Sequence, residues 1–307
     1  MKVAGRVEAV PPYPFVEISR KIAAKKAQGI DVISFGIGDP DLPTPPSVLD
    51  ALHKASLQAP NHRYPESEGL PEFRGAVANW YKKRFDVKLD PETEVVSLIG
   101  AKEGIGHAAM AFVEPGDIAL VPDPGYPVYS VGTLFAGGES YLMPLMEGNQ
   151  WFPDLDAIPE DVAKKATIMW LNYPNNPTGA TATRDQFAKA IEFARRHDVV
   201  LMHDACYSEI AYDGYQPLSL LQVEGARDVA VEFHSLSKSY NMTGWRLGMA
   251  VGNPEVIKAL HTIKSNMDSG VPQAIQQMGI AAMDIPEGEL SDRNEIYQSR
   301  RDLDVGA

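Results

Sequence analysis

The sequence contains very little cysteine and no long hydrophobic run. Its single cysteine, Cys206, cannot form an internal disulfide, which fits a protein of a reducing compartment, and we expect it to be a small buried residue. No apolar run is long enough to span a bilayer. The N-terminus, with Glu8 and three prolines by Pro14, lacks the apolar core of a signal peptide. We therefore expect a cytoplasmic protein.

Basic residues are also scarce. The chain has 28 Lys and Arg against 41 Asp and Glu, and its net charge of -13 argues against nucleic acid or an anionic membrane as a partner. Seven histidines show neither His-Glu-x-x-His nor Cys-His spacing, so we predict no metal site. The Gly-x-Ser-x-Gly elbow of serine hydrolases is missing too. With 44% apolar residues, the 307-residue chain can bury a large globular core.

Apolar strand-like runs alternate with helical patterns through most of the chain. This alternation predicts an α/β fold, a three-layer α/β/α arrangement with a mainly parallel sheet between helices. The predicted strands are 94–99, 117–122, 139–143, 167–171, 199–203, 229–234 and 247–251, and the predicted helices are 70–83, 102–112, 184–196 and 254–266. Turns rich in proline and glycine follow several strands, at the edge where parallel sheets bind ligands.

We expect three segments along the chain. Residues 1–36 would form an N-terminal arm and part of a small domain, and residues 37–286 the large, ligand-binding domain. Residues 287–307 are polar and would begin the C-terminal part of the small domain with a helix. Because neither end completes that small domain, the sequence reads as a truncated form of a longer protein.

The run from Ser235 to Gly248 carries the strongest chemical signal. Ser235 and Ser237 precede Lys238, and Arg246 follows eight positions later. A lysine for Schiff-base chemistry must lose its proton near neutral pH, which partial burial and a neighbouring cation favour. Arg246 can supply that cation while it binds a phosphate as a planar fork. Taken alone, the run fits a Ser- and Lys-rich loop before a strand equally well.

Two polar residues follow the predicted strand 199–203. Asp204 lies at its carboxyl tip and Tyr207 three residues later. If the ligand is pyridoxal phosphate, a carboxylate there keeps the pyridine nitrogen protonated, and Tyr207 would donate to the ring oxygen. Alternatively, Asp204 caps the next helix and Tyr207 is an ordinary amphipathic residue at a domain edge.

Two further turns follow strands. Asn176 lies in Asn-Asn-Pro-Thr-Gly, where its amide could bind a ring oxygen and a substrate carboxylate, although a turn alone explains the motif. Ala101 and Lys102 open a helix after Gly100, so backbone N–H groups there can bind a phosphate. The glycine spacing does not match the dinucleotide fingerprint.

An aromatic residue and a glycine pair complete the candidates. Tyr126 lies in a turn after another strand, where its ring could stack on a flat cofactor or simply pack in the core. Gly36 and Gly38 could let the backbone approach a substrate carboxylate, or could shape a turn.

In their order and setting, these residues resemble the fold-type I, class I/II aminotransferases over nearly the whole chain. Segments 37–45 and 100–105 look like those of the LL-diaminopimelate aminotransferases, and alanine and branched-chain-type enzymes share parts of them. The resemblance implies a pyridoxal 5'-phosphate cofactor held covalently by Lys238, which also moves a proton. It places Asp204 at the ring nitrogen, and Tyr207 and Asn176 at the ring oxygen.

The same resemblance implies roles for the remaining candidates. Around the cofactor it places Tyr126, stacked on the ring, and Ala101, Lys102, Ser235, Ser237 and Arg246 near the phosphate. Tyr64 would reach the phosphate of a neighbouring subunit, which requires a homodimer. The substrate side would comprise Tyr13, Gly38 and Asn266, together with Lys102, Tyr126 and Asn176.

The chain departs from this family at its C-terminus. Family members continue through a segment with an arginine that binds the substrate α-carboxylate, and this chain stops at Ala307 without it. Arg293, Arg300 and Arg301, on the preceding helix, are not convincing replacements. Since a bidentate arginine supplies both affinity and orientation, we expect cofactor attachment to be better supported than turnover.

Three functions remain under consideration. The first is an aminotransferase of lysine biosynthesis that exchanges an amino group between LL-diaminopimelate and 2-oxoglutarate, or a related enzyme of alanine, aromatic or methionine type. The second is a pyridoxal-phosphate lyase that performs β-elimination or ring-forming elimination, which would release pyruvate or ammonia. The third is an aminotransferase-like ligand domain of a transcription factor, although no basic helix-turn-helix segment precedes residue 40.

Overall fold

The computed structural model describes residues 1–34 and 38–306, which form two compact units, Met1–Asp41 and Leu42–Ala307. The first unit contains helices α1 (Gly5–Glu8) and α2 (Pro14–Lys26). Gly36 lies outside the described residues. The domain limits 1–36, 37–286 and 287–307 stay predictions.

The Leu42–Ala307 unit is built from alternating strands and helices. Its strands are β1 (Val95–Leu98), β2 (Ile118–Asp123), β3 (Glu139–Pro144), β4 (Ala166–Asn172), β5 (Val200–Asp204), β6 (Ala230–Ser235) and β7 (Gly248–Gly252). Its α-helices are α3 (Pro46–Ser56), α4 (Pro71–Phe85), α5 (Ala101–Phe112), α6 (Val128–Ala136), α7 (Glu160–Ala163), α8 (Arg184–His197), α9 (Ala226–Val229), α10 (Leu236–Ser239), α11 (Pro254–Met267), α12 (Gln273–Met283) and α13 (Glu287–Val305).

The strands pair into a single mixed sheet within the described residues. Their order is β1-β7-β6-β5-β4-β2-β3. Neighbours from β6 to β3 run parallel, and β7 runs antiparallel to both β6 and β1. The predicted mainly parallel sheet of an α/β fold is therefore confirmed. The antiparallel direction of β7 was not predicted, because hydrophobicity along a strand is the same in either direction.

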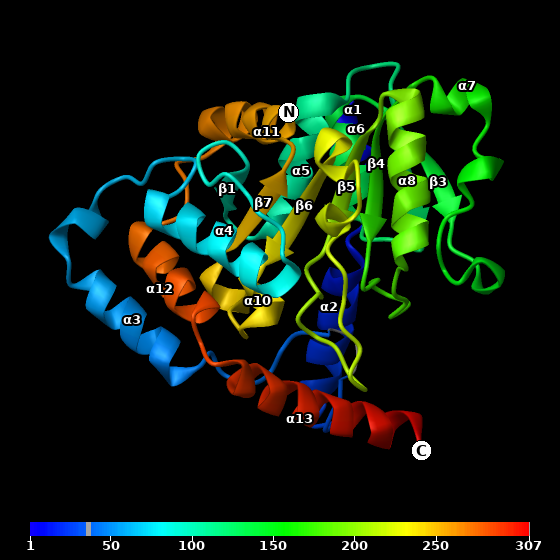
Figure 1. The fold of residues 1–307 in the computed structure, drawn as a ribbon. Coiled ribbons are helices and arrows are strands. Elements are labelled where there is room, and N and C mark those ends of the chain that lie inside the picture. Colours follow the sequence, from blue (N-terminus) through cyan, green and yellow to red (C-terminus); the bar gives the residue numbers. More distant parts are fainter. Residues whose placement is uncertain (35–37, 307) are drawn as a thin grey trace. The chain divides into compact units, whose positions relative to one another are not determined.

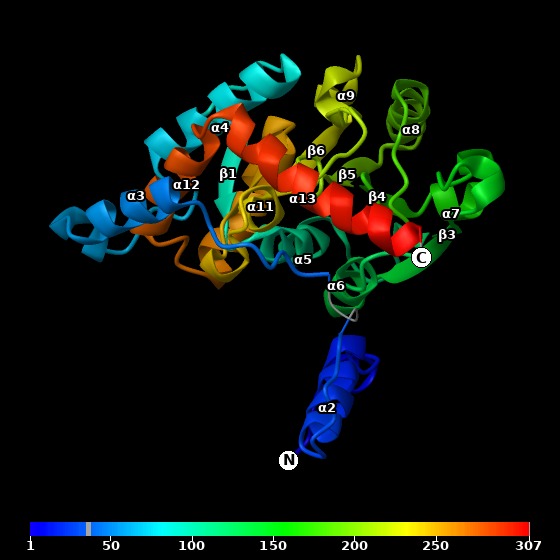
Figure 2. The same ribbon diagram turned by 90° about the horizontal axis from the view of Figure 1, so that it is seen from below.

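Helices cover both faces of this sheet, as the three-layer prediction requires. Helices α5, α6 and α11 lie on one face, and α4 and α8 lie on the other (Figure 1). The alternation of side chains along β4 shows how one strand serves both layers. Ile168 and Trp170 pack into the core of the α5 face, whereas Met169 and Leu171 pack into the core of the α8 face. Figure 2 shows the same sheet and α13 from below.

Local signals explain where several helices begin and end. Helix α8 starts with a capping box, in which the side chains of Thr183 and Gln186 each accept from the other's backbone N–H. It ends at Asp198 in the left-handed conformation. Helix α4 has Pro71 at its first position, where a backbone N–H would have no intrahelical acceptor, so the proline removes no hydrogen bond.

All seven predicted strands and all four bounded helices are present, shifted by one or two residues. The segment from residue 287, expected to begin as a helix, forms α13 over 19 residues. Helices α3, α6 and α12 were not predicted. Helix α6 is rich in β-branched and aromatic residues with low helix propensity, and its place as the crossover between β2 and β3 decides its conformation.

Within residues 1–34 and 38–306, no helix combines the length and the apolar character needed to cross a bilayer.

Candidate active site

Three neighbouring parallel strands end at the same edge of the sheet and carry the candidate site. Asn172 at the end of β4 pairs with Asp204 at the end of β5, and Asp204 pairs with Phe233 of β6. The segments that follow these strands contain Asn176, Tyr207 and Lys238, respectively. Strands β4, β5 and β6 lie side by side in Figure 1. The sheet thus brings together residues that the sequence separates.

The carboxylate of Asp204 is buried and held from two directions. Its Oδ2 accepts a 2.8 Å hydrogen bond from the hydroxyl of Tyr129, and its Oδ1 accepts one of 3.2 Å from the Cys206 backbone N–H. The Tyr129 ring stacks on Trp170 at 4.8 Å between centroids, which fixes the phenol in turn. Burial raises the pKa of Tyr129 well above its usual value, and the nearby Asp204 charge raises it further, so the hydroxyl keeps its proton. Cys206 is only half-buried, whereas we expected it to be buried.

Asn176 and Tyr207 are in direct contact. The Asn176 Nδ2 donates to the Tyr207 hydroxyl oxygen at 3.1 Å. Burial raises the pKa of Tyr207, so its hydroxyl also stays protonated. Asn172 links this pair to Asp204, because its Nδ2 donates to the Asp204 carbonyl at 2.8 Å and its Oδ1 accepts from the Asn176 backbone N–H at 2.8 Å.

Lys238 lies in the short helix α10, directly after β6. Ser235 caps this turn, with its Oγ accepting from the Ser237 backbone N–H at 3.2 Å. The Arg246 Nη1 donates to the Ser237 Oγ at 3.3 Å and to the Thr243 carbonyl at 2.9 Å. Lys238 is half-buried, whereas Ser235 and Ser237 are buried. The predicted Ser-Lys-Arg constellation is therefore one spatial cluster.

The start of helix α5 lies against the guanidinium of Arg246. Gly100 has φ 72°, and a Cβ added there would stand 2.3 Å from the Arg246 Nη2, so only glycine permits this approach. The helix begins at Ala101 without a side-chain cap. The first backbone N–H groups of a helix have no intrahelical acceptor and attract anions. Together with Arg246 they suit a phosphate group.

A buried ion cluster holds this start of α5 in place. Glu103 accepts a 2.9 Å hydrogen bond from the Ile99 backbone N–H and lies 3.5 Å from the ammonium of Lys264. Lys264 is fully buried and also donates to Asp268 at 2.9 Å. His107 lies 2.6 Å from Glu103. These carboxylates could suit a cation, and the Lys264 ammonium already supplies the positive charge there.

The other predicted site residues of the Leu42–Ala307 unit are half-buried or exposed. Tyr126 is half-buried with its ring edge-on to Tyr129 at 5.9 Å, and Lys102 is exposed in the first turn of α5. Tyr64 is 88% exposed. Asn266, near the end of α11, is exposed and donates to the Thr262 carbonyl at 2.8 Å.

Tyr13 and Gly38 belong to the Met1–Asp41 unit. Tyr13 is 40% exposed, and both residues lie among those that the structure describes. Their part in substrate binding stays a prediction.

The arginines of α13 have partners other than a substrate. Arg293 is buried and donates to the backbone carbonyls of Lys238, Ser239 and Glu209. The Arg301 guanidinium donates to Asp213 at 2.6 Å, and that of Arg300 lies 5.7 Å from the centre of the Tyr297 ring. That none of the three replaces a carboxylate-binding arginine stays a prediction.

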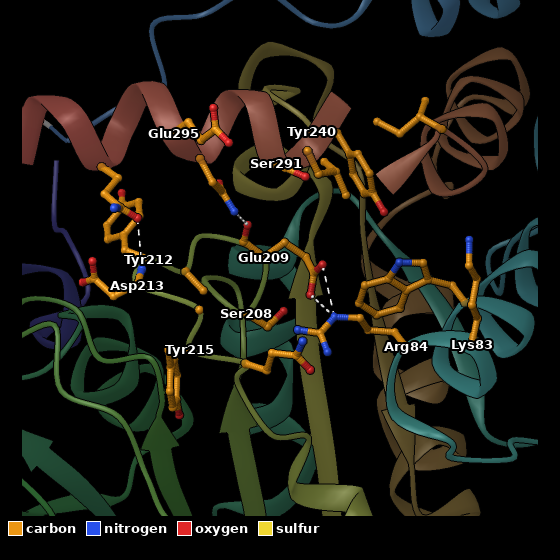
Figure 3. A pocket seen from close by; sticks show the side chains of 18 of the residues that line it. Lys83, Arg84, Ser208, Glu209, Tyr212, Asp213, Tyr215, Tyr240, Ser291 and Glu295 are labelled. Atoms are coloured by element: carbon orange, nitrogen blue, oxygen red, sulfur yellow. Dashed lines mark hydrogen bonds and ion pairs between the residues drawn. The ribbon is translucent and has the colours of Figure 1, made fainter. Parts of the chain in front are cut away.

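A cavity of about 480 Å³ lies beside Tyr240, two residues after Lys238 in the sequence (Figure 3). It is lined by α4, by the segment from Ser208 to Gln216, by Tyr240 and by α13. Lys238, Asp204 and Asn176 are not among its lining residues. The cavity therefore borders the supports of the site rather than the site.

Sequence reasoning missed two residues of this cluster, Tyr129 and Asn172. Both had weak signals: Asn172 is polar at the end of an apolar strand, and Tyr129 follows Tyr126 by nearly one helical turn. With them, the donor set matches pyridoxal phosphate group by group. Arg246 and the start of α5 suit the phosphate, Asp204 suits a protonated ring nitrogen, and Lys238 suits the aldehyde.

Comparison with known proteins agrees with this chemistry. The sequence profile of the family described as aminotransferase class I and II matches residues 30–305. The chain is 60% identical over 307 residues to an LL-diaminopimelate aminotransferase of Dehalococcoides mccartyi, covering all of this chain and 79% of that relative. It is 56% identical to the LL-diaminopimelate aminotransferase of Moorella thermoacetica, covering 99% of this chain and 78% of the relative.

Solved structures show the same likeness. The substrate-bound BacF structure from Bacillus subtilis has a TM-score of 0.94 and 39% identity, covering 98% of this chain and 77% of that one. A Thermus thermophilus aspartate aminotransferase has a TM-score of 0.92 and 28% identity, covering 99% of this chain and 79% of that one. The fold and the family thus agree in two independent comparisons.

Proposed function

The chain belongs to the aminotransferase class I and II family, and from this premise we propose that it exchanges an amino group between LL-diaminopimelate and 2-oxoglutarate with pyridoxal phosphate as cofactor. The observation that supports the chemistry best is the shared edge of β4, β5 and β6, where the Asn176–Tyr207 pair, Asp204 and Lys238 converge. The choice of LL-diaminopimelate is supported by the similarity to LL-diaminopimelate aminotransferases at up to 60% identity.

Each group of the cofactor has a partner in this chain. Arg246 and the first N–H groups of α5 would hold the phosphate, and Gly100 leaves room for the guanidinium. Asp204, oriented by Tyr129, would face the pyridine nitrogen. Asn176 and Tyr207 would donate to the ring oxygen. When bound, pyridoxal phosphate supplies an electron sink for the bonds at the substrate Cα.

Lys238 has two tasks in this proposal. Its Nζ would hold the cofactor covalently. The same amine would act as a general base and acid that moves the proton of the substrate Cα. The cap by Ser235 and the hydrogen bonds around Arg246 fix the turn that carries this amine.

The proposal extends to partners and setting. Tyr64 is exposed in the loop before α4, and we propose that it contacts the phosphate of a second copy in a homodimer. Tyr13, Gly38, Lys102 and Asn266 would contact the substrate. The reaction would serve lysine biosynthesis in the cytoplasm.

Two measurements on the purified protein test the function. Addition of pyridoxal phosphate should produce the absorbance band of the lysine-bound cofactor, and this band should be missing in Lys238→Ala. LL-diaminopimelate and 2-oxoglutarate together should yield glutamate. A protein that shows the band but reacts with neither substrate would refute the substrate assignment, and release of pyruvate or ammonia without amino transfer would indicate a lyase.

A further inference from the structure

We propose that Arg293 of α13 is a positioning residue. It connects the Lys238 turn to the segment that follows Tyr207, and so fixes the Lys238 amine and the Tyr207 hydroxyl relative to each other. This inference rests on the proposed function. Arg293 donates to backbone carbonyls, so it would act through the backbone of the segments that carry the reacting groups.

The guanidinium of Arg293 bridges two segments of the chain. Its Nη1 donates to the carbonyls of Lys238, at 3.3 Å, and of Ser239. Its Nη2 donates to the Glu209 carbonyl at 2.7 Å. Lys238 and Glu209 are far apart in sequence, so this one side chain joins the turn after β6 to the segment after β5.

Neighbouring residues of α13 strengthen the same bridge. Asn294 accepts from the Arg293 Nη2 at 2.9 Å and donates to the Glu209 carbonyl at 3.0 Å. One turn further on, the Tyr297 hydroxyl oxygen accepts from the Asn241 Nδ2 at 2.9 Å, three residues after Lys238. The helix thus holds the lysine turn at two points.

The two bridged segments both border the cavity. Glu209 and Tyr240 line the cavity of about 480 Å³ (Figure 3). The Glu209 carboxylate points to Arg84 at 3.1 Å, and its carbonyl faces α13. Helix α13 therefore supplies donors to backbone carbonyls of both segments at this border.

An arginine is the side chain that suits this bridge. Its planar fork can donate to several carbonyls in fixed directions, whereas the lysine ammonium is a point charge on a flexible stem. Burial lowers the pKa of Arg293, and the neighbouring Tyr297 and Glu209 oppose this shift. Arginine nevertheless stays protonated in proteins, so the bridge persists at every working pH.

The experiment compares Arg293→Lys and Arg293→Met with Arg301→Lys, which changes an arginine of the same helix that binds Asp213 instead. We expect both Arg293 variants to shift the pH at which the lysine-bound cofactor band titrates. We also expect kcat to fall about tenfold, with KM changed less than about threefold, because misplaced reacting groups lower the rate of the chemical step. Arg301→Lys should match the parent protein in all three.

Asn294→Ala provides a second test if the Arg293 variants do not fold, because it removes one contact to Glu209 and one to Arg293. It should shift the titration in the same direction by less. If the folded variants keep the parent's titration and kcat and lose only thermal stability, Arg293 is structural and the inference is wrong. A parent protein without the band or without transamination would instead refute the proposed function.

Discussion

The Asp204 side of the site and the Lys238 turn are built in different ways. Asp204 rests on buried, packed side chains: Tyr129 donates to it and stacks on Trp170, and beneath it the His203 ring lies 2.8 Å from Glu232. The Lys238 turn is buried too, but it borders a cavity at Tyr240 and receives hydrogen bonds from α13 on its backbone carbonyls. The Asp204 side is thus oriented by a stacked tyrosine side chain, and the Lys238 turn by backbone hydrogen bonds from a distant helix.

Removal of the reactive amine of Lys238 should have the largest effect on activity. Lys238→Ala should abolish transamination and the absorbance band, since no other group can take over covalent attachment. It should leave the fold intact, because the half-buried Lys238 side chain is not part of the core. Absorbance and amino-transfer assays check this, with the exposed Lys164→Ala as control. Full activity in Lys238→Ala would contradict the site assignment.

Removal of the charge on the packed side should have the next largest effect. Asp204→Asn keeps the shape but cannot keep the ring nitrogen protonated, so kcat should fall roughly 100- to 1000-fold, as for other preorganised electrostatic groups. Steady-state kinetics measures the fall, and the exposed Asp161→Asn serves as control. A decrease below about threefold would mean that Asp204 only caps the turn.

The end of β6 that leads into the Lys238 turn should also show its burial in acid. Burial lowers the pKa of His234 from 6.5 to about 4, against the raising effect of Glu232. The unfolded chain therefore binds a proton at His234 at a higher pH than the folded protein does. The stability associated with the neutral, buried His234 is fully present above pH 6.5 and is lost as the pH falls to about 4. The free energy of unfolding should fall by up to about 3 kcal/mol.

Urea unfolding at several pH values checks the acid effect. His234→Gln should flatten the dependence between pH 6.5 and 4, whereas the exposed His62→Gln should not. An unchanged slope in His234→Gln would assign the acid sensitivity to other groups.

The smallest effect should follow from removal of the Tyr129 hydroxyl, which orients the Asp204 carboxylate. Tyr129→Phe keeps the stacked ring and removes only the hydroxyl that donates to Asp204, so we expect about a tenfold lower kcat and weaker cofactor binding. Cofactor titration and kinetics measure both, with the half-buried Tyr141→Phe as control. Parent-like values would show that the Cys206 N–H alone orients Asp204.

Sequence patterns predicted most of the fold because strand and helix periods are local. Each predicted strand was found within two residues, since short apolar runs bounded by glycine and proline leave few alternatives. Helix α6 was missed because its composition opposes helix and only its crossover position favours one. The direction of β7 was missed because pairing direction depends on the whole topology.

For the site, the chain's own pattern was sufficient to name the residue types at the strand ends: Lys238, Asp204, Asn176 and the Gly100 turn. Those positions follow from local signals, namely an apolar strand that ends in a polar residue. The fold alone decided the rest: Tyr129 reaches Asp204 across 75 positions, Arg246 fits against Gly100, and Arg293 joins two distant turns. Such contacts leave no periodic trace in a sequence, because they depend on where packing brings separate elements together.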